Sequence, residues 1–246
     1  MLEVEDLSKS YGETVALDSA SLAFAPGAIH AILGENGSGK STLVKLLSGV
    51  VPPSRGVIRV DGRPIERFSP RAFQALGLAT VFQEVLIAPD RSAADNIFLG
   101  CDGLIRRSAP RAQRPGLAAD LLNSIANTKF DVNIPAGHLP LAARQLVVLA
   151  RALIRRPRVL ILDEVTAALD FADRESVFLT MEAFSRAGGL ILFISHRMDE
   201  VLRLAHRVTI LRNGRVVETL DRSSLSPEQM LRLMAPAAAK EIGHGR

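Results

Sequence analysis

Residues 34–42 read Gly34-Glu35-Asn36-Gly37-Ser38-Gly39-Lys40-Ser41-Thr42 and match the pattern G-x-x-x-x-G-K-[ST]. Its glycines let the backbone curl so that N–H groups point inward, where they can bind phosphate. The helix expected to follow presents its N-terminus to the same anion. Lys40 is then placed to reach the β- and γ-phosphates of a nucleotide, and Ser41 to ligate Mg²⁺. We therefore take all of residues 34–42 as candidate nucleotide-binding residues.

The neighbouring residues favour a phosphate-binding loop over a glycine-rich surface loop. Residues 28–33 form a mostly apolar stretch, typical of a strand, that runs straight into the loop. Residues 40–50 have helical spacing, with Leu43, Leu46 and Leu47 on one side. Strand, loop and helix in this order are the context in which the motif has its phosphate-binding meaning.

A second motif lies at residues 159–164, where the apolar run Val159-Leu160-Ile161-Leu162 ends in Asp163 and Glu164. The carboxyl ends of parallel strands face the ligand crevice, so both carboxylates are expected there. Asp163 is predicted to hold Mg²⁺, directly or through water. Glu164 is predicted to be the general base for an attacking water, because one carboxylate cannot easily do both. The alternative is a strand that simply ends in charges.

Short apolar runs joined by helical stretches predict an α/β fold with a mainly parallel sheet covered on both faces. Its buried strands are expected at 28–33, 78–82, 159–162 and 190–194, with a helix over 174–185. The N-terminal segments predict an edge strand over 2–7 and further strands at 15–17, 21–25 and 57–60, forming an antiparallel part. Residues 208–217 predict a hairpin with a type I′ turn at Asn213-Gly214. Residues 227–234 predict a last helix with Ser226 as its cap.

The pattern changes between residues 84 and 156, where strand signals are absent and prolines interrupt the helical stretches. We therefore expect a core in two parts, residues 1–83 and 157–235, separated by an all-helical insertion at 84–156. Residues 236–246 are expected to form a frayed C-terminal tail.

The composition excludes several classes of protein. Hydrophobic residues make up 48% and charged residues 23% of the 246, enough for a sizeable core and too little charge for a disordered chain. The mean hydropathy is +0.19, yet the apolar runs are far shorter than the ~20 residues of a membrane span. The acidic, alternating start predicts no signal peptide. The only cysteine, Cys101, excludes an intrachain disulfide and fits a reducing cytoplasm.

The net charge of +4 does not require a nucleic-acid partner. Arginines nevertheless cluster within residues 106–114 and 151–158. These clusters are either solvated helical faces or contacts for anionic ligands or partners.

Taken together, the motifs resemble those of the nucleotide-binding subunit of ABC transporters, and within that family those of ATPases of bacterial monosaccharide importers. The resemblance covers residues 1 to about 235 and implies a P-loop NTPase core. Besides the two motifs above, it rests on segments that follow the family order: Tyr11, Val81-Phe82-Gln83-Glu84, Ala168-Leu169-Asp170 and Ile194-Ser195-His196-Arg197. Residues 94–100, 194–201 and 207–215 resemble the sugar branch of the family.

The resemblance gives four further residues a role. Tyr11 would stack on adenine, where a tyrosine after a strand is otherwise a packing residue. Gln83 would contact Mg²⁺ and the attacking water, the alternative being a surface glutamine. His196 would contact the γ-phosphate, although a merely structural histidine is possible. Asp170 would reach across a dimer interface, unless it only caps the helix that begins beside Phe171.

The sequence departs from the family at the signature loop, which normally reads Leu-Ser-Gly-Gly-Gln and binds the partner subunit's nucleotide. Here residues 139–143 read Leu139-Pro140-Leu141-Ala142-Ala143. Pro140 has neither hydroxyl nor N–H, and a lost hydrogen bond to a charged group is worth roughly 1.5–3 kcal/mol. The helix N-terminus remains, with its dipole and free N–H groups. We expect a degenerate signature and an asymmetric pair of sites, unless this branch tolerates such loops without asymmetry.

The resemblance implies a subunit that binds ATP and Mg²⁺ and hydrolyses ATP to energise transport. It would work as a head-to-tail dimer with a second ATP-binding subunit or domain, identical or different. It would dock on an integral membrane permease at the cytoplasmic face of the inner membrane and serve a periplasmic or extracellular solute-binding protein indirectly. No nucleic acid is expected. The alternatives are an ABC-type ATPase of DNA repair or translation, and a nucleotide-binding regulator with little turnover.

Overall fold

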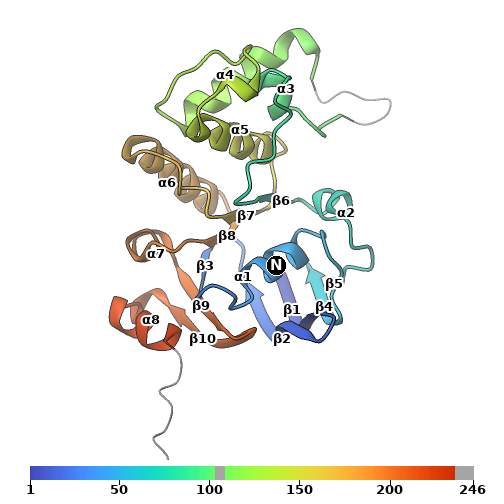
Figure 1. The fold of residues 1–246 in the computed structure, drawn as a ribbon, viewed down its shortest axis with the longest axis vertical. Helices are drawn as coiled ribbons and strands as arrows, with labels where there is room; N and C mark the ends of the chain where they lie inside the picture. Colours follow the sequence, from blue (N-terminus) through green and yellow to red (C-terminus); the bar gives the residue numbers. More distant parts are fainter. Residues whose placement is uncertain (103–108, 236–246) are drawn as a thin grey trace, which may run out of the picture.

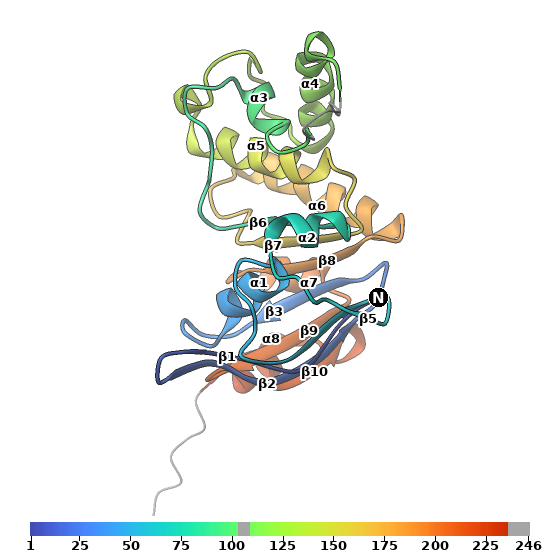
Figure 2. The same ribbon diagram turned by 90° about the vertical axis from the view of Figure 1, so that its right-hand side faces the viewer.

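The computed structural model describes residues 1–102 and 109–235, so the expected tail at 236–246 lies outside the described residues. Two sheets and a group of helices form successive layers (Figures 1 and 2). The phosphate-loop helix α1 (Lys40–Leu47) lies between the two sheets, and the helices of 84–156 lie at the far end from the antiparallel sheet. This arrangement confirms the predicted fold class.

The antiparallel sheet has the order β2-β1-β4-β5. Its strands are β1 (Leu2–Tyr11), β2 (Thr14–Phe24), β4 (Arg55–Val60) and β5 (Arg63–Pro64). The prediction of an edge strand at the N-terminus was wrong, because β1 pairs with β2 on one side and β4 on the other. Apolar alternation reports that one face of a strand is buried, and it does not report how many neighbours the strand has.

The two strands predicted at 15–17 and 21–25 are one strand, β2. Its pairing with β1 is irregular, and Ser19 within it has a left-handed backbone with φ of 50°. A bulge of this kind shifts which side chains face the core, so the alternation breaks without ending the strand.

The second sheet has the order β10-β9-β3-β8-β7-β6. Its strands are β3 (Ile29–Leu33), β6 (Leu78–Val81), β7 (Val159–Asp163), β8 (Leu190–Ile194), β9 (Arg207–Arg212) and β10 (Arg215–Asp221). All but β10 run parallel, and every residue of β3, β7 and β8 is buried. Asn213 and Gly214 have φ of 51° and 77°, which confirms the predicted type I′ turn between β9 and β10.

The helices of the core close both faces of this sheet. They are α1, α2 (Pro70–Ala75), α6 (Phe171–Arg186), α7 (Met198–Leu204) and α8 (Pro227–Met234), with a 3₁₀ turn at Arg222–Ser224. Helix α1 ends earlier than predicted because Gly49, with φ of 71°, follows its last turn. Helix α6 begins earlier than predicted because the Asp170 carboxylate accepts from the N–H of Asp173. The predicted Ser226 cap of α8 is confirmed.

The described residues between 84 and 156 contain helices and no paired strand beyond one isolated bridge. The helices are α3 (Ala93–Ile97), α4 (Arg114–Ile125) and α5 (Leu141–Leu153), with 3₁₀ turns at Arg111–Gln113 and Ala136–His138. Helix α5 packs against both α3 and α4. Nowhere in 1–102 or 109–235 is a helix long and apolar enough to cross a membrane.

Candidate functional site

The phosphate loop connects the end of β3 to the start of α1, as its sequence requires. A Cβ atom at Gly34 would lie 2.2 Å from the Leu211 carbonyl oxygen and 2.4 Å from the Ser38 hydroxyl. At Gly39, which caps α1 with φ of 106°, a Cβ would lie 2.8 Å from the Ala16 carbonyl oxygen. Both positions therefore exclude any side chain, which explains these glycines physically.

Lys40 folds back over this loop. Its Nζ donates to the carbonyl oxygens of Gly34 at 2.7 Å and Glu35 at 2.9 Å. Burial lowers the pKa of Lys40, and the negative charges of Glu164 and Asp163 act in the opposite direction. The ammonium group is therefore within electrostatic reach of both carboxylates of the acidic motif.

The acidic motif places its two carboxylates differently. Asp163 is the buried last residue of β7. Glu164 has a left-handed backbone with φ of 52°, and its N–H donates to the Ile194 carbonyl of β8 at 3.0 Å. Burial, followed by the charge of Glu164, raises the pKa of Asp163, whereas Lys40 lowers it. On an extended strand, adjacent side chains point to opposite faces. The left-handed backbone at Glu164 turns the chain after β7, so the two carboxylates are not bound by that alternation.

Three candidate catalytic side chains meet at the carboxyl ends of neighbouring strands. Gln83 follows β6, Glu164 follows β7 and His196 follows β8. The Glu164 carboxylate accepts from Gln83 Nε2 at 3.1 Å, and its Oε1 lies 2.5 Å from His196 Nε2. Gln83 and His196 are exposed, while Glu164 is partly buried between them. The structure thus brings these residues together, while their catalytic roles stay predictions.

The donor set beside the loop fits a magnesium ion. Ser41, Asp163 and Gln83 offer hydroxyl, carboxylate and amide oxygens, the ligand chemistry that Mg²⁺ prefers. The described residues contain no cluster of three or more histidine, cysteine or acidic side chains that could hold a metal unaided. Mg²⁺ needs no such cluster, because it keeps waters and phosphate oxygens as ligands. Burial, ahead of the Glu164 charge, raises the pKa of Asp163, and a cation bound beside this carboxylate would favour its charged form.

The remaining loop residues differ in exposure. Glu35, Asn36, Gly37 and Ser41 are exposed, and Thr42 is partly buried. Ser38 is buried, and its hydroxyl has no hydrogen-bond partner. An unpartnered buried hydroxyl inside a curled loop is an unusual feature that a ligand could satisfy.

Tyr11 ends β1 and is 46% exposed. Its ring lies 5.3 Å from the Nζ of Lys9, measured to the ring centroid. The following strand β2 reaches the phosphate loop, since the Asp18 N–H donates to the Gly214 carbonyl and the Gly214 N–H donates to the Ser38 carbonyl. The adenine-stacking role of Tyr11 stays a prediction.

The degenerate signature loop leads into α5. Pro140 is the N-cap of this helix and makes no side-chain cap hydrogen bond, whereas serine or aspartate side chains cap α2, α3, α6 and α8. Pro140 and Leu141 are exposed, Leu141 at 57%. The loop therefore offers an apolar rim around the N–H groups of the first turn. Sequence reasoning missed Arg144, whose guanidinium donates to the carbonyls of Leu139 at 2.7 Å and Gly137 at 2.6 Å.

Asp170, which was predicted, and Glu200, which was not, both have clear structural roles. Asp170 caps α6, the alternative weighed for it, while its role across a dimer interface stays a prediction. Glu200 was missed, because an acidic residue in the first turn of a short helix is ordinary in sequence. The structure buries it fully beside the site.

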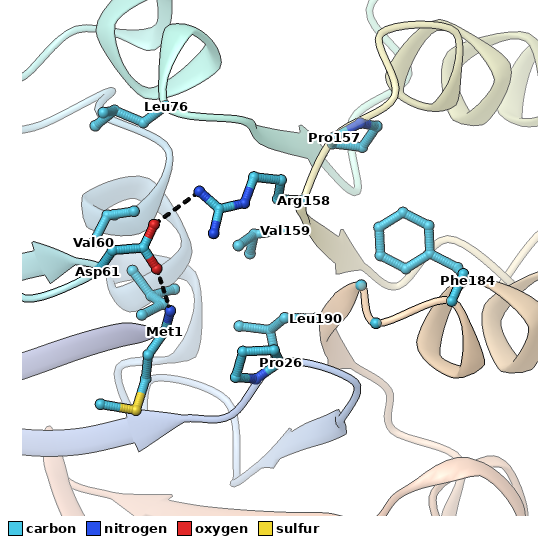
Figure 3. A pocket seen from close by; sticks show the side chains of 14 residues that line it. Met1, Pro26, Val60, Asp61, Leu76, Pro157, Arg158, Val159, Phe184 and Leu190 are labelled. Atoms are coloured by element: carbon cyan, nitrogen blue, oxygen red, sulfur yellow. Dashed lines mark hydrogen bonds and ion pairs between the residues drawn. The ribbon is translucent and has the colours of Figure 1, made fainter.

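A separate cavity of about 240 Å³ lies at the opposite end of the parallel sheet, where β7 and β8 begin (Figure 3). Asp61 at its rim accepts from the Met1 amino group at 2.6 Å and from Arg158 at 2.8 Å. Its walls are otherwise mainly apolar, and none of the predicted site residues lines it.

The parallel sheet order and the phosphate loop define a nucleotide-binding domain of the P-loop kind. Residues 17–167 match the family described as "ABC transporter", and the chain belongs to that family as one of its ATP-binding domains. This confirms the resemblance found in the motifs.

The chain is similar in sequence to curated proteins that are named for sugar import. A ribose import ATP-binding protein, RbsA 1 of Rhizobium johnstonii, is 41% identical over 95% of this chain and 46% of its own length. RbsA 2 of Rubrobacter xylanophilus, also named for ribose import, is 36% identical over 98% of this chain and 47% of its own length. The chain thus spans about half the length of the curated relatives it matches.

Solved structures agree with the fold. A dimeric ATP-binding cassette in a post-hydrolysis state, bound to ADP and phosphate, superimposes with a TM-score of 0.82 over 90% of this chain and 99% of that one, at 23% identity. CbiO1 of Clostridium perfringens, described as part of an ABC transporter complex, gives a TM-score of 0.76 at 27% identity, covering 94% of this chain and 92% of that one.

Proposed function

We propose that this chain binds and hydrolyses MgATP to energise a sugar importer, as one ATPase unit of a head-to-tail pair. The observation that carries the proposal is Glu164, which accepts from Gln83 at 3.1 Å and lies 2.5 Å from His196 beside the phosphate loop. A carboxylate held between two polar side chains is suited to orienting a water and taking its proton.

The loop and Lys40 would bind the nucleotide. Backbone N–H groups of residues 34–42 and the N-terminus of α1 favour the phosphates. Lys40 now donates to carbonyls of its own loop, and it would exchange these for phosphate oxygens. Tyr11 would stack on adenine. Because a phosphoryl transfer asks little covalent chemistry of the protein, positioning and charge stabilisation supply most of the rate.

The residues around the γ-phosphate divide the work of hydrolysis. Ser41, Asp163 and Gln83 would hold Mg²⁺, which neutralises charge on the phosphates when bound. Glu164 would accept the proton of the attacking water. His196 would contact the γ-phosphate while its ring keeps the Glu164 carboxylate in place.

The signature loop would make the two sites unequal in a pair whose other member has an intact signature. Pro140 removes the hydroxyl and N–H that the family motif provides, and Leu141 adds an exposed apolar side chain. A missing charged hydrogen bond of roughly 1.5–3 kcal/mol weakens the contact by about tenfold to a hundredfold. With a partner whose signature is intact, the site formed by this chain's phosphate loop and the partner's signature would hydrolyse ATP well. The site formed by the partner's phosphate loop and this chain's signature would hydrolyse it poorly. In a homodimer both sites would carry the defect.

The partners follow from the proposed activity. The second ATP-binding unit comes from another chain or domain, and α3–α5 dock on integral permease subunits. A periplasmic or extracellular binding protein delivers the solute, and the chain works at the cytoplasmic face of the inner membrane. A monosaccharide is the proposed solute, since the matching relatives are named for ribose import.

Co-purification and turnover test this function together. The chain, expressed in its source cells, should pull down a permease and an ATP-binding partner. The complex should hydrolyse ATP, and Glu164→Gln should reduce turnover at least a hundredfold while nucleotide binding remains. Recovery only with DNA or ribosomes, or full activity in the Glu164→Gln complex, would contradict the proposal.

A further inference from the structure

A buried carboxylate joins the two segments that carry Glu164 and His196. Glu200 lies in the first turn of α7 and is 1% exposed. Its two oxygens each lie 3.0 Å from the Thr166 hydroxyl, and Oε2 also accepts from the Ser195 hydroxyl at 2.6 Å. Thr166 is two residues beyond Glu164, and Ser195 directly precedes His196.

The network around this carboxylate is buried except at Arg197. Thr166 and Ser195 are each 5% exposed. The Ser195 oxygen also accepts from the Arg197 N–H at 3.1 Å, and the Arg197 guanidinium lies 3.9 Å from Glu200 Oε1. The hydrogen bonds of Glu200 thereby connect the loop after β7, which holds Thr166, to the loop after β8, which holds Ser195.

We propose that Glu200 is a positioning residue for ATP hydrolysis: it holds Thr166 and Ser195 so that Glu164 and His196 keep the separation catalysis needs. The inference rests on the function proposed above. A buried charge is a poor source of stability compared with an apolar side chain of similar volume. Its directional hydrogen bonds do specify distance, and misplacing a reacting group by about 1 Å can cost a hundredfold in rate.

The substitution Glu200→Gln tests this role. Glutamine keeps the length of the side chain but removes the charge and replaces one acceptor oxygen by an NH₂ donor. In one orientation that donor faces the Ser195 hydroxyl, which then loses its acceptor, and in the other it faces the Thr166 hydroxyl and the positively charged Arg197. In the assembled complex we expect kcat to fall at least tenfold, with KM for ATP within threefold of wild type. A residue that only stabilises the fold would lower the melting temperature and leave kcat of the folded protein unchanged.

Two threonines provide a matched comparison. Thr166→Val removes a buried hydroxyl from the Glu200 network. Thr209→Val removes one from a network on β9 with His30 at 2.7 Å and Thr219 at 2.8 Å, which contains no predicted site residue. Both should reduce thermal stability, and only Thr166→Val should reduce kcat. If Glu200→Gln does not fold, Thr166→Val and Ser195→Ala answer the same question.

A double-mutant cycle separates positioning from a general defect. If Glu200 acts through His196, Glu200→Gln should cost much less in a His196→Ala background than in wild type. Equal costs in both backgrounds, or wild-type kcat in Glu200→Gln, would overturn the inference. Glu164→Gln in the same assay distinguishes the two failures, because an unaffected rate there would overturn the proposed function itself.

Discussion

Replacing His30 by glutamine should remove much of the acid sensitivity of the fold. His30 is 1% exposed on β3; its Nε2 lies 2.7 Å from the Thr209 hydroxyl, and its Nδ1 has no partner. Burial, and then the charge of Arg207, lower the pKa of His30 from 6.5 to about 3, while Asp221 acts in the opposite direction. The native protein therefore holds this ring neutral at every pH at which it is normally handled.

The sign and size of the effect follow from this pKa. Below about pH 6.5 the unfolded chain binds a proton at His30 that the native chain refuses, so stability falls with pH until about pH 3. At about 1.4 kcal/mol per pH unit once the unfolded ring is charged, the loss between pH 7 and pH 5 is about 2 kcal/mol. That is a substantial part of the roughly 5–15 kcal/mol that stabilises a typical domain.

Urea unfolding at pH 7, 6 and 5 measures this loss directly. Glutamine can still hydrogen-bond to Thr209 but does not titrate, so wild type should lose about 2 kcal/mol more than His30→Gln over this interval. His138→Gln, which removes an exposed histidine, is the control. The same pH dependence in wild type and His30→Gln would refute the reasoning.

Three further outcomes are expected. Gly34→Ala should abolish ATP binding in a fluorescent-nucleotide titration, because its Cβ would lie 2.2 Å from a backbone oxygen; binding within threefold of wild type would contradict this. Hydrogen bonds from Arg158 and from the chain's amino group lower the pKa of Asp61 to about 2, so the stability they add, complete above about pH 4, should be lost as pH falls toward 2. Asp61→Asn should reduce the pH dependence of the free energy of unfolding between about pH 4 and pH 2, measured by urea unfolding, and an unchanged pH dependence would exclude the pairing in solution. Pro140→Ser with Ala142→Gly should raise the steady-state ATPase rate of the complex, by about tenfold to a hundredfold in a homodimer and up to about twofold with a partner whose signature is intact, and no gain would count against a degenerate signature.

Much of the site could be predicted because its chemistry demands particular residues. The glycines at 34 and 39 are forced by contacts under 3 Å, and apolar strands that end in polar residues mark the crevice edge of a parallel sheet. Gln83, Glu164 and His196 follow three adjacent strands, so topology alone brings them together.

The features that could not be predicted from the sequence depend on contacts that leave no local sequence pattern. The central place of β1 is set by its pairing with β4, about fifty residues away in sequence. Glu200 finds its partners 34 residues and 5 residues away, and only burial distinguishes it from a surface glutamate. Arg144 closes the loop before α5 by bonds to main-chain carbonyls, which any sequence supplies.

The left-handed backbone at Glu164 carries a cost that the rest of the chain must absorb. A non-glycine residue with φ of 52° gives up about 1–2 kcal/mol relative to an ordinary conformation. Glycine would relieve that strain, yet it would remove the carboxylate that contacts Gln83 and His196. The candidate base thus occupies a position where the backbone conformation alone favours glycine, so a screen for stability would not by itself select the residue proposed as general base.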